Sequence, residues 1–143
     1  MNIKTLSLLF FTLMYNLLFS QEYVETNYMG REGVILCRSY FTDEYLQTHE
    51  VFNLKVSEVH KFEKKLDELG KPYKSYVRKY EGIVKDDQKL ISVKMLKNNT
   101  LHQYNNPNWK EDKTVYIHTC GVRGIIYNIL TDKIIYNKNY ECK

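Results

Sequence analysis

The sequence predicts an α+β domain in which a twisted antiparallel sheet of about five to seven strands curls around one amphipathic helix. Residues 58–69 have the apolar spacing of a helix, whereas the segments around them alternate or are rich in β-branched and aromatic residues. The chain has 13 tyrosines and two prolines, a composition that suits half-buried strands. Because one helix cannot cover two faces of a sheet, we expect the sheet to curl around it.

The first residues have the features of a cleavable export signal. Lys4 is the only charge among the first 21 residues, and residues 6–19 are almost entirely apolar. A basic start, an apolar stretch and a small residue at the cut define a secretory signal peptide. We therefore expect residues 1–20 to be removed, with the cut near Ser20/Gln21. An uncleaved anchor is the alternative, but a span needs about 20 apolar residues and this run is shorter.

The remaining chain, residues 21–143, is expected to be one domain in the periplasm or outside the cell. A formal charge of +4 is too small to indicate nucleic acid. Cations and aromatic residues interleave over residues 71–80, as on single-stranded nucleic-acid surfaces, but export argues against that partner. No later segment is apolar enough to span a bilayer, so we expect no stable membrane span after cleavage.

Three segments lie before the helix. Residues 21–32 are polar and mixed, and we interpret them as a loose lead. Residues 33–41 are β-branched and aromatic and predict a strand. Residues 50–56 alternate with period two, which is typical of a half-buried strand.

The helix over residues 58–69 is predicted by an apolar stripe and by its two ends. Ser57 is a good N-cap residue, and Gly70 and Pro72 end the helix. The stripe consists of Val59, Phe62, Leu66 and Leu69.

Strand signals dominate after the helix. Asp86 to Gln88 predict a turn, residues 97–113 a long loop, and residues 121–124 a tight connection. The strands are expected at residues 73–84, 90–96, 114–120, 125–130 and 134–136. This element order resembles cystatin-like and NTF2-like architectures, which host many different functions.

The three cysteines are Cys37, Cys120 and Cys142, and in an oxidising compartment two of them are expected to pair. The last hairpins would bring Cys142 back beside Cys120. We therefore favour a Cys120–Cys142 disulfide, with Cys37–Cys142 as the next choice. Cys37 has apolar neighbours and is expected to be a buried thiol.

A short motif resembles one in small exported proteins of the Bacteroidetes. Tyr76, Arg78, Tyr80 and Gly82 form a Tyr-x-Arg-x-Tyr-x-Gly pattern. Trp109, the glycines at 121 and 124 and the Ser20/Gln21 cut also have similar places, and the likeness covers residues 50–137. The chain departs from the pattern at residues 119–121, which read Thr-Cys-Gly in place of Asp-Gly-Gly. The resemblance implies the compartment and the α+β fold, and no activity.

Five residues are candidates for binding. Trp109 in the long loop could anchor a ligand or cap the sheet. Tyr76, Arg78 and Tyr80 belong to a strip of cations and aromatic residues that could face outward and meet lipid headgroups, glycans or an acidic partner. In the enzyme alternative, Tyr76, Tyr80 and His118 could instead point inside the curled sheet.

Catalytic and metal chemistry have weaker signals. His118 and Cys120 alternate onto one strand face, but no paired spacing typical of zinc accompanies them, so we expect no metal and no cofactor. A Cys120 nucleophile would need an oriented base and a lowered thiol pKa, which no pattern indicates. The carboxylate pairs Asp86-Asp87 and Glu111-Asp112 are ordinary turn and loop residues.

We therefore interpret the protein as an exported non-catalytic binding module of the cell envelope or extracellular space. Its partner would be a protein, a peptide or an envelope component. One alternative is a small cystatin-like or NTF2-like enzyme with its site in the concavity of the sheet. Another is an inhibitor of a secreted hydrolase, which would use loop 97–113 or turn 121–124 as a wedge.

Overall fold

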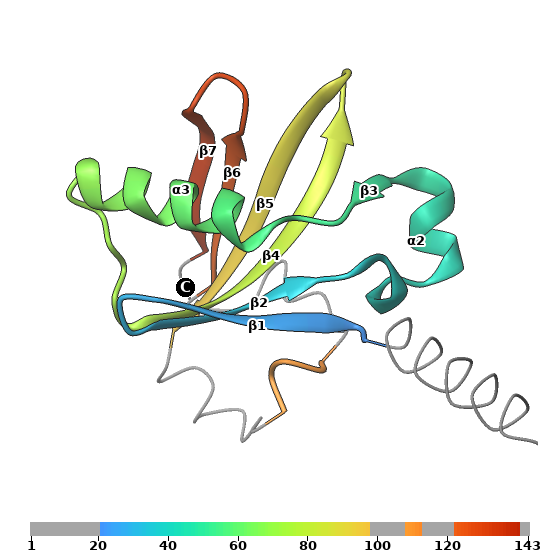
Figure 1. Cartoon of the computed structure of the whole chain (residues 1–143), viewed down its shortest axis with the longest axis horizontal. Helices are drawn as coiled ribbons and strands as arrows, with labels where there is room; N and C mark the ends of the chain where they lie inside the picture. Colours follow the sequence, from blue (N-terminus) through green and yellow to red (C-terminus); the bar gives the residue numbers. More distant parts are fainter. Residues whose placement is uncertain (1–20, 98–107, 113–121, 141–143) are drawn as a thin grey trace, which may run out of the picture.

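The computed structural model describes residues 21–97, 108–112 and 122–140. These residues form a mixed α+β fold, as predicted, with seven strands in one sheet (Figure 1). The strands are β1 (Tyr23–Tyr28), β2 (Arg31–Leu36), β3 (Glu50–Phe52), β4 (Tyr76–Lys85), β5 (Gln88–Lys97), β6 (Val122–Asn128) and β7 (Lys133–Tyr140). The helices are the 3₁₀ turn η1 (Arg38–Tyr40), α2 (Asp43–Thr48) and α3 (Val56–Glu68).

The strands follow the order β1-β2-β4-β5-β6-β7, and β3 pairs with the end of β4. All pairs are antiparallel except β2 and β4, which run in the same direction. The helix α3 lies across one face of this sheet (Figure 1), where its Phe62 and Leu66 belong to one buried cluster with residues of β4, β5 and β6. We call this the helix face and the opposite one the far face.

The helix α3 confirms the most clearly patterned element of the sequence. It begins at Val56, slightly earlier than expected, so Ser57 lies in the first turn instead of capping it. The side chain of Glu58 accepts a hydrogen bond from the backbone N–H of Lys55 at 2.8 Å. Gly70 has φ +66°, a left-handed conformation that glycine adopts without strain, and it follows the end of the helix.

The prediction of a loose lead over residues 21–32 is wrong, because these residues form β1 and the start of β2. The turn between them has positive φ at Met29 and Gly30, and the Asn27 side chain accepts a hydrogen bond from the Gly30 N–H at 2.9 Å. The strand was hidden because β1 lies at the edge of the sheet and alternates partly buried with exposed polar residues.

The segments between β2 and α3 also differ from expectation. The strand predicted to reach residue 41 ends at Leu36, and η1 follows it. The short helix α2 was not predicted, although Thr42 caps it by accepting a hydrogen bond from the Tyr45 N–H at 3.3 Å. The strand predicted over residues 50–56 is only three residues long, because the chain turns into α3.

The strand β4 begins at Tyr76 instead of residue 73, whereas β5, β6 and β7 are longer than predicted. β4 and β5 form one hairpin whose turn, Asp86 and Asp87, has φ values of +51° and +58°, which suits a two-residue hairpin turn. Residues 122–124 belong to β6 and do not form a connection, and β7 extends to Tyr140. The strand expected at residues 114–120 lies outside the described residues, as does most of the loop 97–113.

Both faces of the sheet carry a buried apolar cluster. The helix-face cluster joins α3 to the middle strands through residues such as Phe62, Leu66, Ile91 and Tyr127. The far-face cluster is smaller and contains Val77, Leu96, Tyr40 and Trp109 among others. No helix among the described residues is both long and apolar enough to cross a membrane.

Candidate functional site

The motif residue Arg78 is completely buried on the helix face, where it binds a carboxylate of α3. Its Nε donates to Glu63 Oε1 at 2.8 Å, and both side chains are 0% exposed. Arg31 of β2 binds the other oxygen of Glu63 at 3.0 Å and Asp67 at 2.6 Å. The Tyr80 hydroxyl also donates to Glu63 Oε1 at 2.8 Å. One helix carboxylate therefore ties two strands to α3.

Arg78 also holds the chain segment that leads from α3 into β4. Its Nη2 donates to the carbonyl oxygens of Pro72 at 2.7 Å and Tyr73 at 3.1 Å, and its Nη1 donates to the carbonyl of Tyr76. Burial, followed by the charge of Glu63, raises the pKa of Tyr80, so its hydroxyl remains a proton donor. Because Arg78 and Tyr80 are enclosed and hydrogen-bonded, they are placed to stabilise the fold and have no surface to offer a ligand.

Trp109, another predicted site residue, lies under the surface of the far face at 7% exposure. Beside it, Lys79 of β4 is buried and donates to the Asp112 carbonyl at 2.5 Å and to the Tyr40 hydroxyl at 3.1 Å. Burial lowers the pKa of Lys79 to about 8. These contacts hold residues 108–112 on the sheet, so Trp109 caps this part of the far face.

The other predicted residues divide into two groups. Tyr76 is half-buried and packs edge to face against Tyr73, with ring centroids 6.0 Å apart. His118, Cys120 and Cys142 lie outside the described residues, so the His118 site and the favoured disulfide stay predictions. Cys37 is a free, half-buried thiol in the described part of the chain, and burial raises its pKa.

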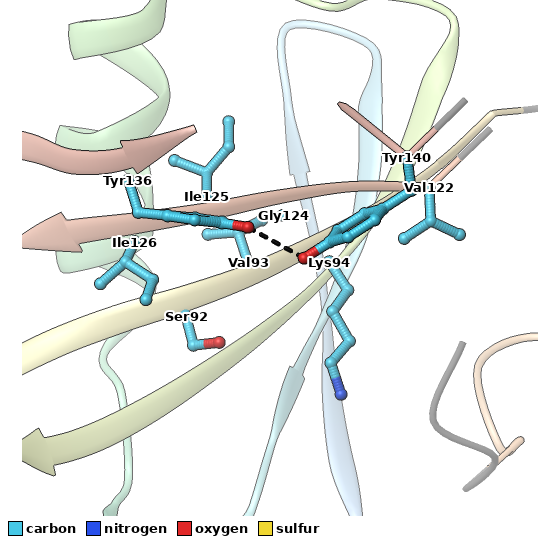
Figure 2. Close-up of a pocket in the computed structure, with 9 residues that line it drawn as sticks. All are labelled: Ser92, Val93, Lys94, Val122, Gly124, Ile125, Ile126, Tyr136 and Tyr140. Carbon is cyan, nitrogen blue, oxygen red and sulfur yellow. Dashed lines mark hydrogen bonds between the residues drawn. The ribbon is translucent and has the colours of Figure 1, made fainter. Parts of the chain in front are cut away.

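A cleft of about 120 Å³ opens on the far face over β5, β6 and β7. Figure 2 shows Tyr136 and Tyr140 of β7 reaching toward each other beside Gly124. Their hydroxyls are hydrogen-bonded at 2.9 Å, which raises the pKa of Tyr136. The cleft is lined by Ser92, Val93, Lys94, Val122, Gly124, Ile125, Ile126, Tyr136 and Tyr140.

Gly124 creates the space between the two tyrosines. A Cβ at this position would lie 3.4 Å from Tyr136 Cε1 and 3.8 Å from Tyr140 Cε2, so any longer side chain would fill the cleft. Tyr136 is 37% exposed, so its ring is accessible from solvent where it lines the cleft. The cleft therefore combines an absent side chain, two aromatic walls and the aliphatic side chains of Val122 and Ile126.

Two lysines flank the cleft. Lys94 lines it from β5, and its side chain extends away from the tyrosine pair (Figure 2). Lys138 of β7 places its Nζ 5.4 Å from the centre of the Tyr140 ring. Register puts Lys79, Lys94, Gly124 and Lys138 opposite one another on consecutive strands, so three lysines share one cross-strand row.

Sequence reasoning missed this cleft because it placed Gly124 in a connection and ended the last strand at Tyr136. The signal was nevertheless present. Tyr136, Lys138 and Tyr140 alternate with asparagines, which is the period-two pattern of a strand with one aromatic and basic face.

A second hollow, of about 250 Å³, lies at the β1–β2 edge and is more polar. Glu25 and Glu32 line it, but Lys110 forms an ion pair with Glu25 at 2.9 Å. Within the described residues, no three His, Cys, Asp or Glu side chains come together to hold a metal ion.

Comparison of the chain with protein families, with curated proteins and with solved structures found no match.

Proposed function

We propose that the protein is an exported, non-catalytic binding module of the cell envelope or extracellular space, and that it binds an apolar side chain of a protein or peptide partner in the Tyr136/Tyr140 cleft. The export part rests on the leader-like residues 1–20. We also propose a cystatin-like or NTF2-like fold and kinship with the small exported Bacteroidetes proteins. The element order and the Tyr-x-Arg-x-Tyr-x-Gly motif support these assignments.

The single observation that carries the binding proposal is the hollow at Gly124. Its volume of about 120 Å³ is close to that of an apolar cavity able to hold one benzene ring, about 150 Å³. A single leucine or phenylalanine side chain matches this size. Two tyrosines form its walls, and tyrosine is one of the residue types enriched among the residues that carry most of the binding energy of interfaces.

The lining also favours an apolar group over a polar one. The two tyrosine hydroxyls are bonded to each other, and the aliphatic side chains of Val122 and Ile126 lie beside them. A sugar ring would need several hydrogen-bond partners in the same space. A side chain without polar atoms needs none, so its burial is favourable.

The helix-face concavity offers less to a ligand. Phe62, Leu66 and Tyr80 are each at most 1% exposed there, and the Tyr80 hydroxyl is bonded to Glu63. The side chains of the described residues therefore fill the space that an enzyme of this architecture would use as its site.

The test is comparative affinity capture from the native envelope fraction, read by mass spectrometry. We expect a partner recovered by the natural protein to be lost with Gly124→Val, whose methyl groups occupy the cleft. Tyr136→Ala is the second variant, because it removes one wall from an exposed position. Each should weaken binding by at least about tenfold, the size expected for an aromatic anchor.

Leu130→Ala is the matched control, since Leu130 is on the same hairpin but 89% exposed at its turn. The cleft assignment is overturned if both cleft variants retain the partner, or if Leu130→Ala loses it equally. N-terminal sequencing tests export separately. We expect the mature protein to begin near Gln21, and an intact Met1 in the cytosol would refute this part.

A further inference from the structure

The lysine row on the far face is unfavourable for the free protein. Lys79 lies directly opposite Lys94 in the β4–β5 register, and like charges opposite each other in a sheet destabilise it. The two amines are close enough for the charge of Lys94 to contribute to the lowered pKa of Lys79. A repulsive row in a folded sheet indicates a purpose other than stability.

Among the three lysines of this row, Lys79 is the one whose buried amine has polar partners within the described residues. The Lys79 amine donates hydrogen bonds to two neutral oxygen atoms, the Asp112 carbonyl and the Tyr40 hydroxyl. In contrast, neither Lys94 nor Lys138 has an ion-pair partner among the described residues. The register places Lys94 and Lys138 on the two strands that flank Gly124, and the Lys138 amine lies 5.4 Å from the centre of the Tyr140 ring. Positive charge therefore lies on both strands beside the apolar cleft.

The nearest carboxylate in the register lies one strand away from the cleft. Glu81 of β4 is opposite Ser92, it is buried, and it accepts a hydrogen bond from the Tyr45 hydroxyl. Glu25 and Glu32 line the other hollow, at the β1–β2 edge. The far face therefore carries its free positive charge over β5 to β7 and its accessible negative charge over β1 and β2.

We infer that the cleft selects an acidic peptide segment, in which one apolar side chain enters between Tyr136 and Tyr140 while flanking Asp or Glu residues bind Lys94 and Lys138. This inference rests on the proposed function and names the chemistry of its partner. Charge complementarity supports it, because Lys94 of β5 and Lys138 of β7 lie on the two strands on either side of Gly124, where the apolar side chain would enter. Acidic neighbours on both sides of that side chain would reach both amines.

The experiment measures binding of three fluorescently labelled peptides to the purified protein by anisotropy. Each peptide has one leucine flanked on both sides by two glutamates, two glutamines or two lysines. We expect the glutamate peptide to bind roughly tenfold more tightly than the glutamine peptide, with the lysine peptide weakest. Raising the salt concentration should reduce this difference, since the charges are exposed.

Variants assign the charge effect to the two lysines. Lys94→Gln and Lys138→Gln should each weaken the glutamate peptide by about threefold and leave the glutamine peptide unchanged. Lys89→Gln is the matched control, because Lys89 is an exposed lysine of the same strand that lies on the helix face, over Phe52. If Lys89→Gln weakens the glutamate peptide as much as Lys94→Gln, the charge effect is unspecific and the inference fails.

The two proposals fail in different ways. Equal binding of the glutamate and glutamine peptides, with loss of both in Gly124→Val, would keep the cleft and refute the acidic partner. Failure of all three peptides, with unaltered capture by the cleft variants, would refute the cleft itself. Binding of an acidic polysaccharide such as alginate, dependent on Lys94 and Lys138 while peptides do not bind, would replace the peptide by another class of partner.

Discussion

Removal of the Glu63 carboxylate is the most direct test of how this fold is stabilised. Glu63→Ala leaves the guanidinium groups of Arg31 and Arg78 buried, at 4% and 0% exposure, without the anion that they share. It also removes the acceptor of the Tyr80 hydroxyl. Asp67 remains for Arg31, but Arg78 keeps only carbonyl oxygens.

The expected loss is a large part of the stability of the domain. Removing one partner of a buried ion pair costs about 3–5 kcal/mol, because an uncompensated charge remains. A whole domain is stable by about 5–15 kcal/mol, so Glu63→Ala is expected to be marginally folded. Glu63→Gln keeps the shape and one acceptor oxygen, and its cost should be smaller, about 1.5–3 kcal/mol.

Urea unfolding followed by circular dichroism measures these differences, and the midpoint should fall while the slope stays constant. Glu68→Ala is the control on the same helix. Its carboxylate is 52% exposed and lies 3.7 Å from Lys65, so its removal should change stability by less than about 0.5 kcal/mol. A loss below about 1 kcal/mol in Glu63→Ala would refute the view that this carboxylate joins α3 to the sheet.

Three further changes have definite expectations. Gly82→Ala should cost more than about 2 kcal/mol of stability, because its Cβ would lie 2.4 Å from the Phe52 carbonyl oxygen. Gly124→Ala should change stability by less than about 0.5 kcal/mol, and equal thermal denaturation midpoints for the two variants would contradict this. The pKa of Lys79 is lowered to about 8, so the unfolded chain binds more protons between pH 8 and about 10.4, and stability should rise with pH across this window relative to Lys79→Met. Hydrogen bonds from the Tyr127 hydroxyl and then from Lys65 lower the pKa of Asp132, so the stability that its carboxylate adds should be present above about pH 4 and be lost on acidification. Acid titration of the natural protein and of Asp132→Asn measures this contribution as the difference in their stabilities, and a difference that does not change with pH would contradict it.

The parts of the fold that local chemistry specifies could be predicted from the sequence. The stripe of α3 and its glycine end are read directly from spacing, and the helix is present. The Asp86-Asp87 turn lies between two alternating segments, and it forms the β4–β5 hairpin. In each case the residues that determine the element lie next to one another in the chain.

The parts that depend on distant contacts could not be predicted. β1 is polar because it is an edge strand, and only its pairing with β2 shows its identity. Arg78 and Tyr80 are residue types typical of a solvent-exposed binding strip, but both bind Glu63 of α3 and are therefore buried in the core. No local pattern distinguishes an arginine that meets solvent from one that meets a buried carboxylate.

The cleft was missed for a related reason. A glycine flanked by strand residues indicates either a bend or a close approach, and its neighbours alone do not decide between them. Gly124 becomes informative only when β7 is laid beside β6 and brings two tyrosines against it.

The parallel pairing of β2 with β4 has a consequence for the order in which the chain folds. Parallel neighbours require a crossover, and here residues 37–75, including α3, separate the two strands. The ribosome releases the N-terminal hairpin first, so one edge of β2 stays unpaired until the crossover and β4 have emerged. The nascent protein therefore passes through a stage with an open backbone rim, at which a chaperone that covers exposed strands would act.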